Sequence, residues 1–248
     1  LLIRLFIPAD EARTARRFDW AGFALSAGAL AALVTGLELF SHEGRAGLAL
    51  ALVAAATATG MLAIRHMNRS LAPLLDLKVL QVRTFALSAL SSGILTRSAI
   101  NATPFLLPLL LQIGFGLDAI ATGSLILVYF LGNLAMKAAT TGFLRLLGFR
   151  TLLVFNGVLA SALVACLGLI GPDTGNTLLW PVLFAAGLTR SMQFTALNTI
   201  AFADIEARQR GDAATISAIS QQISQLLSIA GSIAVIRLIH AFDLVGPD

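Results

Sequence analysis

Long apolar stretches follow one another along the chain, and short polar connections separate them. The stretches are about 20 residues long, the length of an α-helix that crosses the hydrocarbon core of a bilayer. They lack the shortness and the alternation of transmembrane β-strands. Because lipid offers no partner for free backbone N–H and C=O groups, such stretches must be helical. The pattern predicts seven membrane-spanning helices, at Phe18–Phe40, Ala46–Ile64, Phe85–Leu111, Thr122–Ala139, Thr151–Ile170, Leu178–Phe202 and Ser217–Ile239.

The composition agrees with this pattern. Of the 248 residues, 57% are hydrophobic and only 12% are charged, whereas a soluble domain carries about 25% charged residues. The mean hydropathy is +0.87. We therefore expect an all-α fold, a polytopic transmembrane helical bundle whose first partner is the lipid bilayer.

The basic residues are distributed unevenly between the connections. Thirteen of the 17 lysines and arginines lie before the first stretch or in every second connection after it, and only Arg45 and Arg237 lie on the other side. This is the positive-inside asymmetry of an inner-membrane protein. It predicts a bacterial plasma-membrane protein with residues 1–17 in the cytoplasm and the C-terminal end of the chain on the outer side. A nucleic-acid-binding face would gather its charges on one surface, so we expect no nucleic-acid partner despite the pI of about 10.2.

The sequence offers little for catalysis or for metal binding. It has one cysteine, Cys166, and three scattered histidines without metal-ligand spacing. It carries no zinc-protease motif, no nucleophile elbow, no phosphate loop and no dinucleotide fingerprint. We therefore expect a protein that is not an enzyme, with no cofactor and no metal site.

Two arginines lie in the middle of apolar stretches. A central arginine costs roughly 2.5–3.5 kcal/mol on insertion scales, so Arg97 and Arg190 must each face a water-filled cavity or a partner inside the bundle. One interpretation places them on a substrate pathway, together with the nearby Asn101 and Gln193. The other is that they tie helices together by binding backbone carbonyls. Weaker pathway candidates on one face of the last stretch are Gln221 and Gln225.

The predicted membrane segments have two further features: a pair of prolines in one helix, and no acidic residue in the middle of any stretch. Pro104 and Pro108 share a helix face with Arg97 and are predicted to kink that helix. No aspartate or glutamate lies in the middle of a stretch. Proton-driven transporters use such a carboxylate, so a proton-coupled protein must have it elsewhere.

Four segments resemble one family in the same order along the chain. They are "FDWAGFALS" at 18–26, "RSAINATPFLLPLLLQIGFGL" at 97–117, "GLTRSMQFTALNTIAFADI" at 187–205 and "ATISAISQQISQLLSIAGSIAV" at 214–235. They are similar to the C-terminal half of bacterial fourteen-helix drug:proton antiporters of the major facilitator superfamily.

This resemblance implies a domain plan. Family members have two six-helix bundles with two further helices between them. Residues 1–17 would be the cytoplasmic end of a preceding helix, 18–84 two inserted linker helices with a cytoplasmic connection, and 85–248 five of the six helices of the C-terminal bundle. We therefore expect a fragment of a longer protein, partnered by a missing N-terminal bundle.

Two family motifs have counterparts here. The fourth helix of a bundle in this superfamily often carries Arg-x-x-Gln-Gly, linked to proton coupling; Arg190 and Gln193 match it, and Phe194 replaces the glycine. The loop between the second and third helices often reads Gly-x-Leu-x-Asp-Arg-x-Gly-Arg. The resemblance assigns a gating loop here without the acidic residue, at Gly142, Arg145, Gly148 and Arg150.

The function implied is a transmembrane transporter, energised by the proton gradient, that exports drugs or other amphipathic small molecules by alternating access. Uptake in place of export stays open, because a fold does not fix a function. The alternative from another class is a non-transporting membrane subunit or an inactive truncated product, in which the polar stripes only pack helices. A membrane-embedded enzyme lacks any nucleophile, metal cluster or acid pair.

Overall fold

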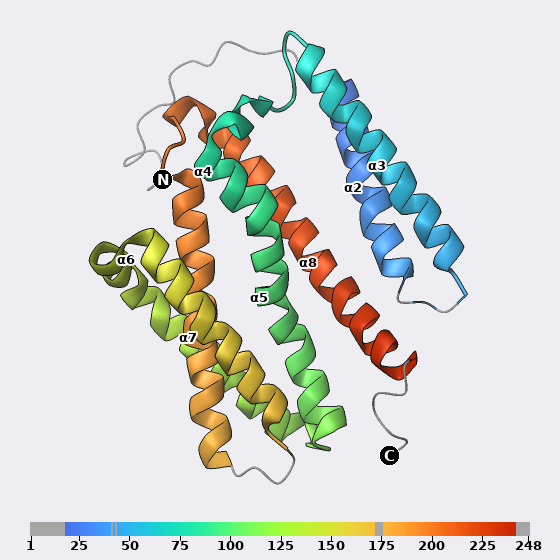
Figure 1. Cartoon of the computed structure of the whole chain (residues 1–248). Helices are drawn as coiled ribbons and strands as arrows, with labels where there is room; N and C mark the ends of the chain where they lie inside the picture. The colour runs from blue at the N-terminus through green and yellow to red at the C-terminus, as the bar shows by residue number, and fades with distance from the viewer. Residues whose placement is uncertain (1–17, 41, 43, 172–175, 242–248) are drawn as a thin grey trace, which may run out of the picture. The chain divides into compact units, whose positions relative to one another are not determined.

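A computed structural model describes residues 18–40, 42, 44–171 and 176–241, and within these ranges every regular element is helical. The described chain forms two compact units. The first contains helices α2 and α3, and the second begins at Lys78 and contains helices α4 to α8 (Figure 1). The predicted domain boundary at residue 84 stays a prediction.

The first unit is a pair of helices that run side by side, α2 (Trp20–Leu39) and α3 (Ala46–Arg69) (Figure 1). The two helices pack tightly at Gly36, where an added Cβ atom would lie 3.0 Å from Val53 Cγ2 and 3.2 Å from the carbonyl oxygen of Ala49. A small residue at this position allows two membrane helices to approach closely.

Asp19 ties three parts of this unit together. Its carboxylate accepts a hydrogen bond from Gly22 N (2.9 Å), which makes it the N-cap of α2. The same carboxylate contacts His66 Nε2 at the end of α3 (2.8 Å) and accepts a hydrogen bond from Leu74 N (3.2 Å) in the connection that follows. The start of α2, the end of α3 and the connection are therefore held by one acidic side chain.

A short 3₁₀ helix at Leu77–Gln81 spans the boundary between the units, and the second unit continues with an irregular helix. The irregular helix consists of α4 (Arg83–Phe85), a π-helical turn at Ala86–Leu90, α5 (Ser91–Leu109) and a second π-helical turn at Leu110–Gly114. Pro104 and Pro108 lie inside α5, and the helix continues through both. A bend at these prolines stays a prediction.

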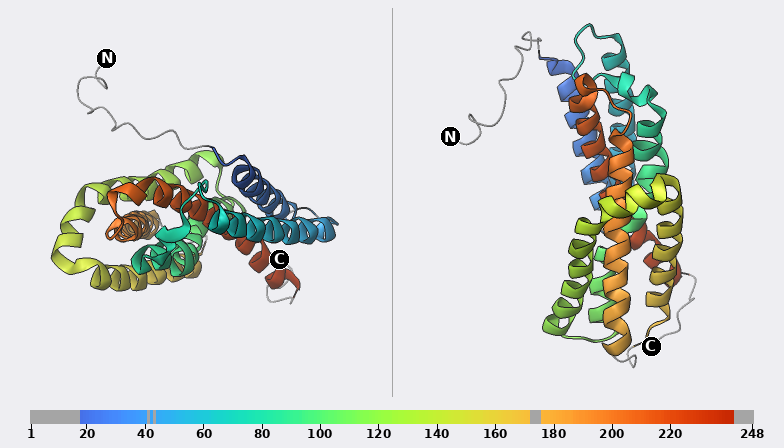
Figure 2. Two further views of the ribbon diagram at one scale, coloured as in Figure 1. Left: turned by 90° about the horizontal axis from the view of Figure 1, so that it is seen from above. Right: turned by 90° about the vertical axis from the view of Figure 1, so that its left-hand side faces the viewer.

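Helix α6 (Ala119–Leu169) is interrupted at Gly148, whose φ of 71° and ψ of 162° are not helical. The predicted helices Thr122–Ala139 and Thr151–Ile170 are its two limbs. Both views in Figure 2 show α7 (Asn176–Phe202) between these limbs. An apolar core of Leu125, Tyr129, Leu183 and their neighbours joins α6 to α7 and to the end of α5.

Helix α8 (Arg210–Ala241) follows a 3₁₀ turn at Ala207–Gln209 and packs against α5. Serines line the packed face of α8, including Ser220 and Ser224, which are fully buried. Small polar side chains allow close helix packing and can bind backbone carbonyls across an interface; Ser220 Oγ donates to the carbonyl of Ala89 in this way.

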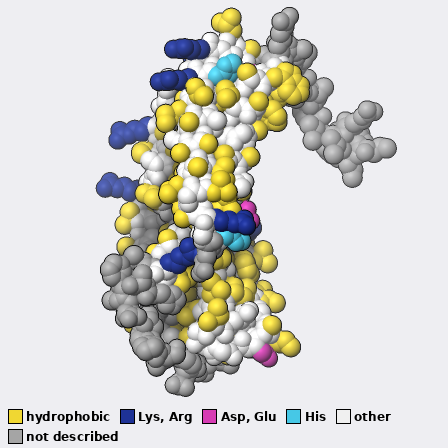
Figure 3. Space-filling model, turned by 90° about the vertical axis from the view of Figure 1, so that its right-hand side faces the viewer, with side chains coloured by type: hydrophobic (Ala, Val, Ile, Leu, Met, Phe, Trp, Pro, Cys, Tyr) yellow, Lys and Arg dark blue, Asp and Glu magenta, His cyan; other side chains and the backbone are white. Residues whose placement is uncertain are grey.

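Five helical segments in the described residues are long and apolar enough to cross a membrane: Trp20–Leu39, Ala46–Arg69, Arg83–Gly114, Ala119–Leu169 and Ala207–Arg237. Many large hydrophobic side chains are exposed, and Figure 3 shows hydrophobic side chains along the face that it draws. All seven predicted stretches are helical where they are described, apart from the end residues Phe18, Asp19, Phe40 and Ile170. The number of seven crossings is not confirmed, because the two limbs of α6 form one merged span and α7 is not among the five.

Candidate functional site

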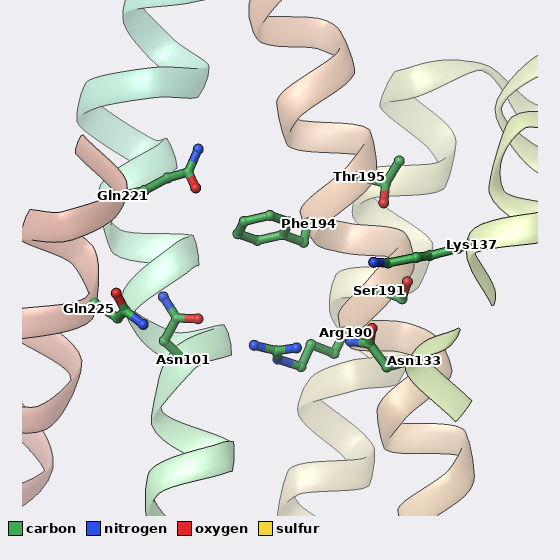
Figure 4. A pocket seen from close by; sticks show the side chains of 9 residues that line it. All are labelled: Asn101, Asn133, Lys137, Arg190, Ser191, Phe194, Thr195, Gln221 and Gln225. Carbon is green, nitrogen blue, oxygen red and sulfur yellow. The ribbon is translucent and has the colours of Figure 1, made fainter. Parts of the chain in front are cut away.

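A polar cavity of about 260 Å³ lies among four helices of the second unit (Figure 4). Helix α5 contributes one side chain, α6 two, α7 four and α8 two. The lining residues are Asn101, Asn133, Lys137, Arg190, Ser191, Phe194, Thr195, Gln221 and Gln225. All but Phe194 carry a hydrogen-bonding side chain, and none is acidic. We call this space the polar cavity.

Arg190 is the central residue of this cavity. It lies in the middle of α7 and is half-buried, and Figure 4 shows its guanidinium group pointing across the cavity toward Asn101. Its Nε atom is buried without a hydrogen-bond partner in the described chain. No described carboxylate forms an ion pair with it, because the ion pairs found there are His66–Asp19 and Arg208–Glu206.

A second cation lines the same cavity from α6. Lys137 lies one helical turn after Asn133, so both side chains are on one face of the helix. Figure 4 shows the Lys137 ammonium group directed toward Ser191, beside Arg190. Within the described residues Lys137 also has no carboxylate partner. The cavity therefore holds two positive charges and several neutral hydrogen-bonding groups.

The opposite wall is formed by amides. Gln221 and Gln225 are one turn apart on α8, and Asn101 faces them from α5 (Figure 4). Gln221 Nε2 makes one long contact with Ser217 Oγ, at 3.5 Å. These amides can donate and accept hydrogen bonds inside the cavity.

A second and more apolar cavity of about 510 Å³ lies in the same unit, and we call it the apolar cavity. It is lined by Thr96, Ala99, Ile100, Thr103, Tyr129, Gly157, Ala160, Ser161, Val164, Ala186, Thr189, Arg190 and Gln193. Arg190 lines both cavities. The two cavities are thus adjacent, and the Arg190 side chain forms part of both linings.

Gln193 also binds between helices. Asn156 Nδ2, on the second limb of α6, donates to Gln193 Oε1 (2.8 Å) and to the carbonyl oxygen of Thr189 (2.9 Å). Both Asn156 and Gln193 are buried. Gln193 therefore fixes α7 to the second limb of α6, while one side of it borders the apolar cavity.

Arg97 lies outside both cavities and is fully buried. Its Nη1 donates to the carbonyl oxygens of Ser88 (2.9 Å) and Ala89 (3.3 Å), and its Nη2 donates to Asn198 Oδ1 (3.0 Å). The two carbonyls belong to the π-helical turn, where the regular backbone pattern is broken. Arg97 therefore binds carbonyls of its own irregular helix and ties that helix to α7 through the side chain of Asn198.

The predicted gating segment follows the cavity residue Lys137 along α6 and begins five residues later at Gly142. Gly142 and Arg145 are on the helix and Gly148 forms its break, so the segment expected to be a loop is helical on both sides of one glycine. Gly142, Arg145, Gly148 and Arg150 are all exposed. A role in gating stays a prediction.

The structure thus brings together four of the predicted pathway residues in the polar cavity, namely Asn101, Arg190, Gln221 and Gln225. Gln193 borders the other cavity, and Arg97 borders neither. The sequence analysis did not select Asn133, Lys137 or Asn156. The sequence did hold a signal for them: Asn133 and Lys137 are four residues apart inside the predicted stretch Thr122–Ala139, and Asn156 is the only amide side chain in the next stretch.

The several long apolar helices define a multi-pass membrane protein. Comparison with known proteins places it among relatives of bacterial transport proteins, as the family resemblance predicted. The chain is 30% identical over 222 residues to multidrug resistance protein MdtD of Serratia proteamaculans and 32% identical over 221 residues to MdtD of Cronobacter sakazakii, in each case covering 87% of this chain and 46% of the relative.

A protein with a different name matches as well. The chain is 28% identical over 233 residues to transport protein HsrA of Haemophilus influenzae, covering 92% of this chain and 49% of the relative. The chain therefore spans about half the length of the curated relatives it matches. No protein-family model matches it. These relatives are named for transport and drug resistance and not for an enzymatic reaction.

Proposed function

We propose that the full protein is a secondary transporter that exports drugs or other amphipathic small molecules by alternating access. The observation that carries the proposal is the polar cavity, in which Arg190 is directed into a space among helices that are otherwise apolar. Ionisable residues inside membrane segments mark substrate or ion pathways. The names of the relatives, multidrug resistance protein and transport protein, support the same class.

The proposal includes a finer architecture. This chain would supply seven crossings of a major facilitator fold, with α2 and α3 as inserted helices and the later helices as most of the C-terminal bundle. The N-terminal bundle would come from the rest of the full-length protein. In such folds the substrate binds near the membrane midplane between the repeats, and Arg190 and Asn101 lie in the middle of their helices.

The energy source proposed is the proton gradient across the bacterial inner membrane, with no cofactor. The described acids near the helices lie at their ends: Asp118 caps α6 and Asp212 lies in the first turn of α8. A carboxylate that carries the proton would then belong to the rest of the full-length protein. The orientation proposed puts residues 1–17 in the cytoplasm and the C-terminal end of this chain outside.

The test is a comparison of dye accumulation in cells with and without the full-length protein. A panel of amphipathic fluorescent dyes should accumulate less in expressing cells, and a protonophore should remove the difference. Immunoblotting of the membrane fraction controls for expression. Equal accumulation of every dye at confirmed expression would contradict the proposal and favour a non-transporting membrane subunit.

A further inference from the structure

We propose that the two cavities hold one ligand, an amphipathic organic anion, with its acidic group in the polar cavity and its apolar body in the apolar cavity. This inference rests on the proposed transport function and names the class of its substrate. The structural basis is Arg190, which lines both cavities and lies where the acidic group and the apolar body of such a ligand would join.

The first argument is charge. Arg190 and Lys137 line one small cavity, and within the described chain no carboxylate pairs with either. Two like charges that line one cavity repel each other. A carboxylate, sulfonate or phosphate between them would remove this repulsion and form charge-assisted hydrogen bonds. A cationic ligand group would meet the same two charges and be repelled.

The second argument is the supply of unused donors. Arg190 Nε and Ser191 Oγ are both buried without a hydrogen-bond partner in the described residues, and Ser191 is 3% exposed. Buried polar groups in folded proteins are nearly always paired. Asn101 and Asn133 add amide donors on the other sides. These groups surround a position where the oxygens of an anion would find several donors.

The third argument is the apolar space beside the charge. Its volume of about 510 Å³ falls inside the range of roughly 300–1,000 Å³ that is typical of small-molecule sites. Its wall is made of side chains such as Ile100, Val164 and Ala160, with the ring of Tyr129 on one side. An aliphatic or aromatic body fits this lining, while a fully polar anion would leave it unfilled.

The acidic group has two possible sources. One is the ligand, and the other is a carboxylate on the rest of the full-length protein that closes the cavity. Both would neutralise Arg190 and Lys137, but only a ligand anion makes the effect of these residues depend on the charge of the ligand. The experiment must therefore compare ligands that share one body and differ in charge.

Dansylaminoundecanoate and its uncharged methyl ester are such a pair. Binding of each to the purified full-length protein in detergent would be measured by equilibrium dialysis, for wild type, Arg190→Gln, Lys137→Gln and Lys137→Arg. The control is Arg65→Gln, which removes one exposed positive charge from α3 and none from either cavity. Thermal unfolding of each variant shows whether it is folded.

We expect the acid to bind wild type at least about tenfold more tightly than the ester, since hydrogen bonds to charged groups are the stronger ones. Arg190→Gln and Lys137→Gln should each remove most of this preference and leave ester binding within about twofold, because the apolar side chains that line the apolar cavity are unchanged. Lys137→Arg and Arg65→Gln should retain the preference for the acid.

Two results would overturn the inference. One is equal binding of acid and ester to wild type; the other is an equal loss of both in folded Arg190→Gln and Lys137→Gln, which would assign the charges to a carboxylate of the protein itself. Transport is measured separately in vesicles. Charge-selective binding without transport of either probe would contradict the proposed transport function and support the ligand class. Transport without charge selectivity would support the transport function and contradict the ligand class.

Discussion

Gly132 on α6 and Gly187 on α7 lie at the same helix crossing, each against the backbone of the other helix. A Cβ atom on Gly132 would overlap the carbonyl oxygen of Phe184, and one on Gly187 would overlap that of Tyr129. Reciprocal small residues of this kind let two membrane helices come into backbone contact. The crossing adjoins both cavities, since Tyr129 and Asn133 line them.

Alanine at either glycine should therefore destabilise the protein. We expect Gly132→Ala and Gly187→Ala each to cost about 1–3 kcal/mol, because backbone atoms must move apart to admit the methyl group. Gly123→Ala is the matched control, on the same helix with no atom within 4 Å of its added Cβ. Thermal unfolding in detergent measures the difference. Wild-type stability of Gly187→Ala would contradict the close crossing.

Gly148 should be sensitive to substitution for another reason. An added Cβ would meet no atom within 4 Å, but the φ of 71° and ψ of 162° lie in a region that is almost restricted to glycine. Gly148→Ala should cost about 1–3 kcal/mol in backbone strain. Gly142→Ala, six residues earlier in regular helix, should be neutral or stabilising. Equal melting temperatures for the two variants would show that the break at Gly148 is not required.

The stability of the α2–α3 pair should depend on acid pH through Asp19. The backbone N–H of Gly22 and then the side chain of His66 hold the pKa of this carboxyl below its ordinary value of 3.8. A lowered folded-state pKa means that the ionised carboxylate stabilises the fold above pH 3.8 and that this contribution is lost as the pH falls through the folded-state pKa.

The comparison that checks this is wild type against Asp19→Asn. Asparagine keeps the helix cap but cannot ionise, so the variant should be less stable at pH 7 and should show a smaller loss of stability below pH 3.8. Melting followed by circular dichroism across this range gives the answer. Parallel pH profiles for the two proteins would exclude Asp19 as the titrating group.

Arg97 and Arg190 should respond differently to the same substitution. Arg97→Met removes the donor to the buried carbonyl of Ser88 and to Asn198 Oδ1, whereas the carbonyl of Ala89 keeps its hydrogen bond from Ser220. A buried group left unpaired costs about 1–3 kcal/mol. Arg190→Met removes no hydrogen bond that the described chain makes. We therefore expect a large fall in melting temperature for Arg97→Met and a small change for Arg190→Met. The reverse order would show that the roles of the two arginines are exchanged.

The two arginines also show what the sequence could and could not supply. Their position in apolar stretches was enough to predict that each needs a polar environment, because lipid provides none. The sequence could not tell which one lines a cavity, because that depends on how each helix is rotated against its neighbours. Arg97 points toward carbonyls of the π-helical turn that precedes α5. The sequence carries no clear signal for a π-helical turn at that place.

The helices themselves were predictable for a similar reason. Backbone groups in lipid must be paired, so the apolar stretches were helical as expected. Gly148 was selected as part of a loop motif. The sequence did not predict that α6 would extend over 51 residues with a break at this glycine alone, because no run of polar residues marks a break of one residue. Lys137 lies near the end of the predicted stretch Thr122–Ala139 and was counted with the charges of the connection that follows. Its place in the cavity depends on how α6 packs against α7.

The most direct test of the account is proton-driven transport by an Arg190 variant of the full-length protein. Everted vesicles with matched amounts of wild type, Arg190→Ala or Arg65→Ala would be energised, and uptake of a dye that the wild type transports would be followed. The account predicts that wild type and Arg65→Ala take up the dye and that Arg190→Ala does not, while all three insert equally into the membrane. Wild-type uptake by Arg190→Ala would remove Arg190, and with it the polar cavity, from the transport pathway.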